Sequence, residues 1–181
     1  MKGIVFNLLE QSVVADHGED VWEELLDVSC LDGVYTSLGS YPDEDLFALV
    51  GAAASVLEVR SDDVVRWFGQ RSLPLFAERY PQLFSRHVDA RSFVLTLNEI
   101  IHPEVRKLYP GAIVPEFGFD TSDADWLGMD YYSPRKLCAF AEGLLIGAGE
   151  HYGQTVTIDQ PQCMNRGDRE CRMNIRFSRT R

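Results

Sequence analysis

Hydrophobic residues recur every three or four positions through much of the first half of the chain, a spacing that predicts helices. Residues 4–13 and 21–26 follow it. Tyr41-Pro42 is expected to open a further helix, because proline suits the first helical turn and three acidic residues follow. Ser61 can cap the next helix, and Pro74 is expected to end or kink it.

A longer helical pattern covers residues 91–109. His102 lies at the edge of its apolar face, and Pro103 follows directly. Proline lacks the backbone N–H that a helix interior uses, so two interpretations stay open. Either the helix kinks at Pro103, or a new helix begins there with proline at its first position.

After Pro110-Gly111 the pattern changes to the alternation typical of strands. Strands are predicted at 116–121, 124–133, 155–160 and 171–178, and a helix at 137–151. Helices followed by strand-strand-helix-strand-strand indicate an α+β fold with a four-stranded antiparallel sheet. We expect one domain, 1–181, made of a helical N-terminal subdomain (1–60) and a C-terminal subdomain (61–181) that contains the sheet.

Composition and charge exclude several classes of protein. The longest uncharged apolar run, Leu46–Leu57, is shorter than the roughly 20 residues that span a bilayer. Asn7 and Glu10 interrupt the N-terminal apolar stretch before it could serve as a signal peptide, so a cytoplasmic protein without membrane partners is expected. The net charge of −11 opposes binding to nucleic acids, whose phosphates are also negative.

Polar residues in the segment Tyr131–Arg135 could bind an anion. Pro134 favours an extended conformation at Ser133, and alternate residues of an extended chain point the same way. The hydroxyls of Tyr131 and Ser133 and the guanidinium of Arg135 would then converge, and this donor set suits carboxylates. A strand end with polar residues facing water remains the alternative.

His102 and the predicted helix 137–151 offer further candidates. No pair of the four histidines has the spacing of a multi-histidine metal site, but one histidine is enough to hold a haem iron. An ordinary core histidine is the other interpretation. Phe140 and Leu144 belong to an apolar stripe that either packs in the core or lines a cofactor pocket.

Taken together, LNEIIHPEVRKLYPGAIVPEF, YYSPRK and the initial MKGIVFNLLEQ resemble the H-NOX family of haem domains over essentially the whole chain. The resemblance implies haem b between the two subdomains, with His102 as the axial iron ligand. It also implies that Tyr131, Ser133 and Arg135 bind the haem propionates. Pro115 matches the family's proline that presses on the haem, and Phe140 and Leu144 match its apolar distal wall.

Three of the four cysteines form a second constellation. Cys163 and Cys171 flank a turn at residues 165–168, and Cys138 opens the predicted helix 137–151. Three thiolates with one further ligand make a zinc site, and three reduced core thiols are the alternative. Some bacterial H-NOX proteins hold zinc with three cysteines and one histidine, and Gln160 stands here at the position that resembles that histidine.

The resemblance implies a sensor of nitric oxide, and of CO, rather than an enzyme. Its signal is expected to arise when His102 is released from the iron. Because the chain ends soon after its last predicted strand, the expected output is a separate histidine kinase, or a diguanylate cyclase or phosphodiesterase. A peroxidase-type haem enzyme is one alternative, although the predicted distal helix offers no acid-base group. A zinc-stabilised interaction module without haem is the other.

Overall fold

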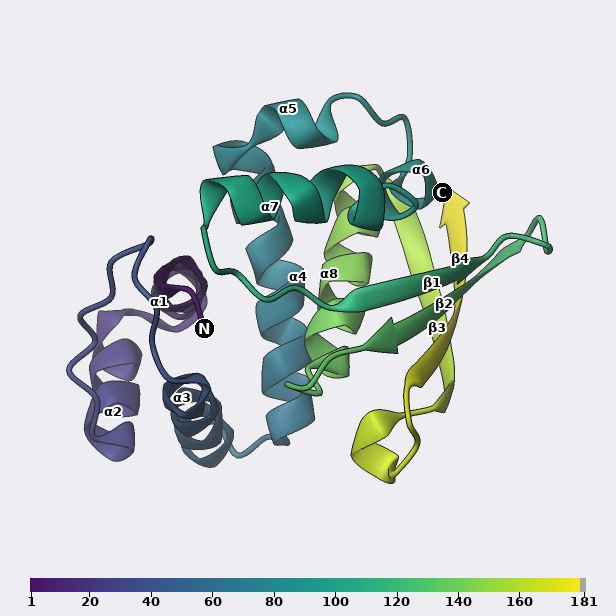
Figure 1. The fold of residues 1–181 in the computed structure, drawn as a ribbon. Coiled ribbons are helices and arrows are strands. Elements are labelled where there is room, and N and C mark those ends of the chain that lie inside the picture. Colours follow the sequence, from purple (N-terminus) through teal and green to yellow (C-terminus); the bar gives the residue numbers. More distant parts are fainter. Residues whose placement is uncertain (180–181) are drawn as a thin grey trace.

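The first part of the protein is a layer of three helices, in a computed structural model that describes residues 1–179 (Figure 1). The helices are α1 (Gly3–His17), α2 (Glu19–Ser29) and α3 (Asp43–Val56). Gly18, with a φ of 92°, makes the reversal between α1 and α2, a conformation that costs little without a Cβ. Phe6, Leu25 and Leu49 are fully buried between these helices. The helical prediction for this half is confirmed.

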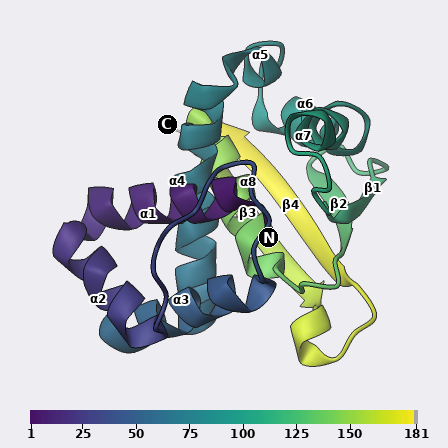
Figure 2. The same cartoon turned by 60° about the vertical axis from the view of Figure 1, so that its left-hand side comes forward.

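Helix α4 (Ser61–Arg79) runs between this layer and the rest of the molecule (Figures 1 and 2). Ser61 is its first residue, and Arg60 takes the capping position without a side-chain hydrogen bond, so the predicted Ser61 cap is wrong. Pro74 does not end α4 either, although it cannot donate to the carbonyl of Gln70. Close packing of α4 against α8 along this stretch holds the helix together.

The predicted helix 91–109 is three segments, preceded by the single turn α5 (Pro81–Phe84). They are α6 (Ala90–Val94), the π-helical turn η1 (Leu97–Ile101) and α7 (His102–Leu108). In η1 the backbone N–H of Ile101 donates over 3.1 Å to the carbonyl of Thr96, five residues back. Pro103 lies in the first turn of α7, where no helical N–H is needed, so a new helix begins at this point.

The second half is built on a four-stranded antiparallel sheet in the order β1-β2-β4-β3, which confirms the predicted fold class. The strands are β1 (Glu116–Asp120), β2 (Trp126–Tyr132), β3 (Gln154–Gln162) and β4 (Cys171–Arg179), and α8 (Cys138–His151) connects β2 to β3. Short η2 (Met164–Arg166) lies between β3 and β4. Leu127, Met129 and Ile175 are buried on the face that α8 and α6 cover.

Two buried clusters fill the interior. One joins the sheet to α8 and the end of α4, and the other joins α1–α3 to the first half of α4. Val64, Val65 and Phe68 of α4 belong to the N-terminal cluster, so the hydrophobic contacts of α1–α3 continue beyond residue 60. The division into 1–60 and 61–181 remains a prediction. Within residues 1–179, no helix has the length and hydrophobicity needed to cross a membrane.

Glycines bring α4 and α8 unusually close together. A Cβ at Gly143 would collide with the carbonyl of Arg66, and one at Gly69 would collide with the carbonyl of Phe140. A Cβ at Gly147 would lie 2.8 Å from the carbonyl oxygen of Gln70. The two helices therefore touch backbone to backbone, in the manner of small-residue helix packing.

Candidate functional site

A cavity of about 500 Å³ lies between α7, α4, α8 and the inner ends of β1 and β2. Its lining is mostly hydrophobic. The seven residues expected to surround a haem all line it: His102, Pro115, Tyr131, Ser133, Arg135, Phe140 and Leu144. Its size and apolar character are those of a cofactor or small-molecule site.

His102 is the first residue of α7, and its ring lines the cavity. The imidazole stacks on Phe117 of β1, with ring centroids 5.4 Å apart. Burial, assisted by the nearby charge of Arg106, lowers the pKa of His102 to about 4. The ring is therefore neutral at physiological pH, which is the form that coordinates a metal. Pro103, the next residue, lies in the first turn of α7, and its ring restricts the backbone φ there.

Tyr131 and Ser133 place hydroxyl groups at one end of the cavity. Tyr131 is the penultimate residue of β2, paired with Phe117 on β1 and Cys171 on β4. Burial raises the pKa of Tyr131 to about 12, so its hydroxyl keeps its proton and can donate a hydrogen bond. Ser133, just beyond the strand, is also buried.

Arg135 also lines the cavity, but a turn carries it there and not the extended strand that was expected. Strand β2 ends at Tyr132, and residues 133–136 form a turn closed by the N–H of Lys136 donating to the carbonyl of Ser133 over 3.0 Å. The expectation that alternate residues of one extended strand converge is therefore wrong for Arg135. Pro134 restricts its own φ as well as its neighbour, and this suits a turn.

Two interactions fix the Arg135 side chain. Its Nε donates to the Asp43 carboxylate over 2.6 Å, and its Nη1 donates to the carbonyl of Ile113 over 3.0 Å. Asp43 also accepts a 2.6 Å hydrogen bond from the N-terminal ammonium of Met1. Sequence reasoning treated Asp43 as an ordinary acidic residue in the first turn of a helix, and nothing local reveals its distant partner.

Phe140 and Leu144 of α8 form an apolar wall of the cavity together with Phe68 of α4. The rings of Phe68 and Phe140 lie 5.0 Å apart at an angle of 42°. None of these three side chains carries a hydrogen-bond donor. These three side chains would therefore offer a ligand only apolar contacts.

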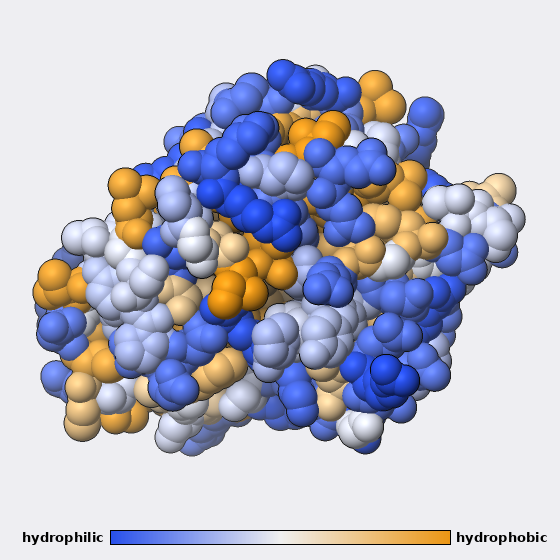
Figure 3. Space-filling model, in the orientation of Figure 1, coloured by the Kyte–Doolittle hydropathy of each residue, from blue (hydrophilic) through white to orange (hydrophobic). Residues whose placement is uncertain are grey.

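The N-terminal segment also contributes to the lining, through Met1, Lys2, Ile4 and Val5. Sequence reasoning missed this role of Lys2, since one lysine near the start of a chain resembles any surface lysine. Ile113 also lines the cavity and is 64% exposed. Figure 3 shows apolar atoms at the surface below α7 on this side of the molecule.

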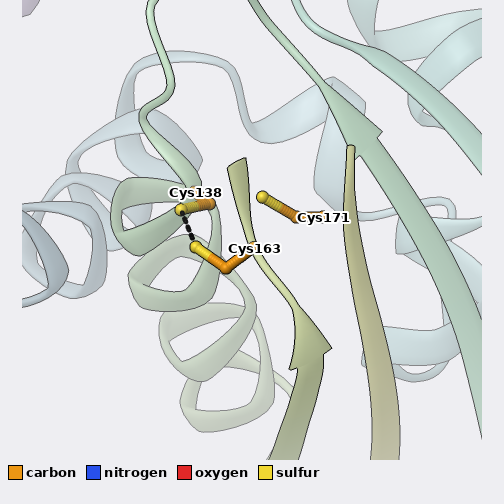
Figure 4. A group of neighbouring side chains, drawn as sticks. All are labelled: Cys138, Cys163 and Cys171. Atoms are coloured by element: carbon orange, nitrogen blue, oxygen red, sulfur yellow. Dashed lines mark hydrogen bonds between the residues drawn. The ribbon is translucent and has the colours of Figure 1, made fainter. Parts of the chain in front are cut away.

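Cys138, Cys163 and Cys171 converge as the sequence suggested. They lie at the start of α8, after β3 and at the start of β4, and their sulfurs point toward one another (Figure 4). All three sulfur atoms lie within 4.8 Å of one another, and those of Cys138 and Cys163 are 3.6 Å apart. All three thiols are free and buried, and burial raises the pKa of Cys138 and Cys171.

Nitrogen donors surround this thiol cluster. The N–H of Met164 donates to the Cys171 sulfur over 3.2 Å, and the side-chain amide of Asn165 donates to the Cys138 sulfur over 3.5 Å. Such donors favour sulfur in its anionic, metal-binding form. Gln160, expected beside the cluster, carries a buried Nε2 without a hydrogen-bond partner. No histidine of residues 1–179 joins the three cysteines. The donor set therefore fits zinc at three positions.

Comparisons with known proteins point in one direction. The family model described as Haem-NO-binding matches residues 2–160. An H-NOX protein from S. oneidensis in the Fe(II)NO state is 38% identical with a TM-score of 0.92, over 98% of this chain and 99% of that one. Unliganded Fe(II) H-NOX from K. algicida is 27% identical with a TM-score of 0.88, over 99% and 98%. H-NOX from Shewanella woodyi in the Fe(II)CO state is 31% identical with a TM-score of 0.83, over 99% and 95%.

Proposed function

Because the chain belongs to the Haem-NO-binding (H-NOX) family, we propose that it senses nitric oxide through a haem b held in the cavity beside α7 and α8. Members of this family are haem-based gas-sensing domains rather than enzymes. NO and CO are the proposed ligands, and relatives from S. oneidensis with known structures in the Fe(II)NO and Fe(II)CO states support this choice.

One observation carries the proposal: a neutral histidine and a group of carboxylate-binding side chains line the same apolar cavity. His102 would hold the iron through a ring nitrogen. Tyr131, Ser133 and Arg135 would bind the haem propionates, while Pro115, Phe140 and Leu144 would contact the ring. Bound haem supplies a ferrous iron that takes NO or CO as its ligand.

The proposed signal starts at His102. His102 would tie α7 to the bound haem, and its release on NO binding would free α7, whose first turn contains Pro103. Pro115, which lines the same cavity, would press on the haem in the resting state, and relief of that contact would let the helical half turn against the sheet half. A separate histidine kinase, or a diguanylate cyclase or phosphodiesterase, then reads the change if it prefers one arrangement.

A zinc ion at Cys138, Cys163 and Cys171 is part of the proposal. The three sulfurs are close enough to share one ion, and N–H donors already reach two of them. Zinc there would connect the start of α8 to the end of β3 and the start of β4. This connection would lie near the end of β2, where the propionate-binding turn begins. Its role would be structural, as is usual for cysteine-rich sites.

The test of haem binding is an absorption spectrum. Wild-type protein loaded with haem should show an intense Soret band that shifts on adding NO or CO. His102→Gly should lose haem or show an altered spectrum, and added imidazole should restore it because it can occupy the space left by the ring. His17→Gly is the matched control, because His17 is exposed and does not line the cavity. An unchanged spectrum in His102→Gly without imidazole would exclude His102 as the ligand.

A further inference from the structure

Helix α7, which begins with His102, packs only loosely on the body of the protein. None of the residues of η1 and α7 is fully buried. Within residues 1–179, η1 is the only helix or strand that packs closely along α7. The face of α7 that carries His102 and Val105 lines the cavity instead. Packing along the helix therefore constrains its position weakly, and the attachments at its two ends become decisive.

The two ends of α7 are attached to different halves of the molecule. Ile101, just before α7, packs against the buried cluster of the sheet half, and the His102 ring stacks on Phe117 of β1. Tyr109, directly after α7, is buried in the other cluster, which joins α1–α3 to α4, and Val105 packs against that cluster too. Helix α7 thus connects the sheet half to the helical half.

A pair of tyrosine hydroxyls fixes the second of these ends. The hydroxyl of Tyr109 shares a hydrogen bond with the hydroxyl of Tyr80, the residue that follows α4. Both tyrosines line the cavity. Burial, together with the hydrogen bond to Tyr80, raises the pKa of Tyr109, so its hydroxyl keeps its proton near neutral pH. This hydrogen bond ties the end of α7 to the end of α4, and its directionality restricts how the two ends can move.

A short helix transmits this attachment to the histidine. The path from His102 to Tyr109 covers about two helical turns, or about 10 Å along the axis. The last of these turns is closed by the N–H of Tyr109, which donates to the carbonyl of Val105 over 2.8 Å. Because the backbone hydrogen bonds make so short a helix move as one piece, a displacement at Tyr109 also displaces His102.

We propose that Tyr80 and Tyr109 are positioning residues, whose shared hydrogen bond holds α7 so that the His102 ring stays aligned with the haem iron. The inference rests on the proposed function, because it requires haem in this cavity. Both tyrosines act through α7 rather than on the iron. The same attachment gives the release of His102 a direction, since a freed α7 swings about Tyr109, the end that is fixed to the helical half.

The experiment compares ferrous holoproteins that lose one hydroxyl and keep the aromatic ring. In Tyr109→Phe and Tyr80→Phe, α7 should sample positions that align His102 poorly, so the iron–histidine stretching band in resonance Raman spectra should broaden and move to lower frequency. After NO is added, His102 should leave the iron about three- to tenfold faster, which corresponds to the loss of one neutral hydrogen bond. The double variant should show no larger effect than either single variant, because the two hydroxyls make one contact.

Tyr152→Phe is the matched control. The Tyr152 hydroxyl donates to the carbonyl of Phe84 over 2.8 Å, and Tyr152 does not line the cavity. This variant loses a comparable hydrogen bond, yet its stretching band and its rate of His102 release should match those of the wild type. Because Tyr80 is only half-buried, Tyr80→Phe provides the test if Tyr109→Phe fails to fold.

Two results would overturn the positioning role. One is a wild-type stretching band or a wild-type release rate in the folded Tyr80→Phe and Tyr109→Phe proteins. The other is an equal change in Tyr152→Phe, which would indicate general loosening of the fold. A wild type that binds no haem, or binds it without His102, would instead refute the proposed function, and the role of the tyrosine pair with it.

Discussion

The guanidinium of Arg135 lies 2.6 Å from the carboxylate of Asp43, and this ion pair joins the turn after β2 to the first turn of α3. The other Asp43 oxygen accepts a hydrogen bond of the same length from the ammonium of Met1. Asp43 therefore positions a proposed propionate-binding residue from the opposite half of the molecule. It also neutralises part of the charge that Arg135 would otherwise present to the cavity.

Asp43→Asn should weaken the fold and the retention of haem together. Loss of the two charge-assisted hydrogen bonds is expected to reduce the free energy of unfolding by about 1–2 kcal/mol, since the pair is partly exposed. Freed from Asp43, the Arg135 side chain should also sample more conformations. Urea unfolding and transfer of haem to an excess of apomyoglobin measure the two effects. Glu44→Gln, an exposed neighbour without a salt bridge, should change neither.

The contribution of Asp43 should depend on pH. Burial opposes ionisation of Asp43, but hydrogen bonds from the Met1 ammonium and Arg135 outweigh it, and the pKa lies below its usual 3.8. A carboxyl with a lowered folded pKa stabilises the protein above its unfolded pKa and loses that effect as pH falls through the folded value. The stability difference between wild type and Asp43→Asn should thus stay constant near neutral pH and shrink below about pH 4. A difference that grows in acid would contradict this assignment.

Oxygen binding tests the apolar wall. Bound oxygen gains from a nearby hydrogen-bond donor far more than NO does, and Phe140, Leu144 and Phe68 offer none. We expect the ferrous protein to bind NO and CO and to show no stable oxygen-bound spectrum in air. Phe140→Tyr should add oxygen affinity if the new hydroxyl reaches the ligand, whereas Phe140→Leu should not. A stable oxygen-bound spectrum in the wild type would remove Phe140 from the distal wall.

Metal analysis tests the thiol cluster. Freshly purified, reduced protein should contain about one zinc per chain besides iron, and oxidants should expel it as the thiolates are consumed. Cys163→Ser should lose the zinc. Cys30→Ser should keep it, since Cys30 is exposed and outside the cluster. Iron without zinc in the wild type would leave three buried thiols whose role is packing.

Hydrogen exchange tests the proposed release of His102. In the NO-bound form, the amides of α7 and η1 should exchange faster than in the ferrous form, because the tether at His102 is cut. Solution scattering should also differ if the two halves rotate. Partner kinase or cyclase activity should respond differently to the two forms. Identical exchange and identical partner activity would reject the mechanism while leaving haem binding intact.

The spacing of apolar residues predicted most of the fold, because within most helices and strands this spacing is regular from end to end. Alternation along residues 171–178 matches β4 closely, since Met173 and Ile175 face the core and Arg172 and Asn174 face outward. The pattern over 91–109 predicts one long helical stretch, because its apolar residues keep a spacing of three or four positions through the π turn. Only Pro103 indicated the break, and it left two interpretations open.

Recognition of motifs found the site residues that lie near one another in sequence. Tyr131, Ser133 and Arg135 fall within five positions, and they do line one cavity. The turn that carries Arg135 to the cavity could not be predicted, because the point at which β2 ends, Tyr132, depends on pairing with β1 and β4. Asp43 and Lys2 escaped notice for a similar reason. Their importance depends on partners far away in the chain, at Arg135 and Pro110.

Because glycines hold α4 and α8 in contact, the wall of the cavity that these helices form should tolerate fewer substitutions than the opposite wall. Backbone atoms set the separation on that side, so no rotamer change could make room for a side chain at Gly143 or Gly69. The side formed by η1 and α7 meets the cavity through side chains, which can be exchanged one at a time. Directed evolution of pocket size should therefore enrich substitutions at positions such as Leu97, Ile101 and Val105 and leave the glycines untouched.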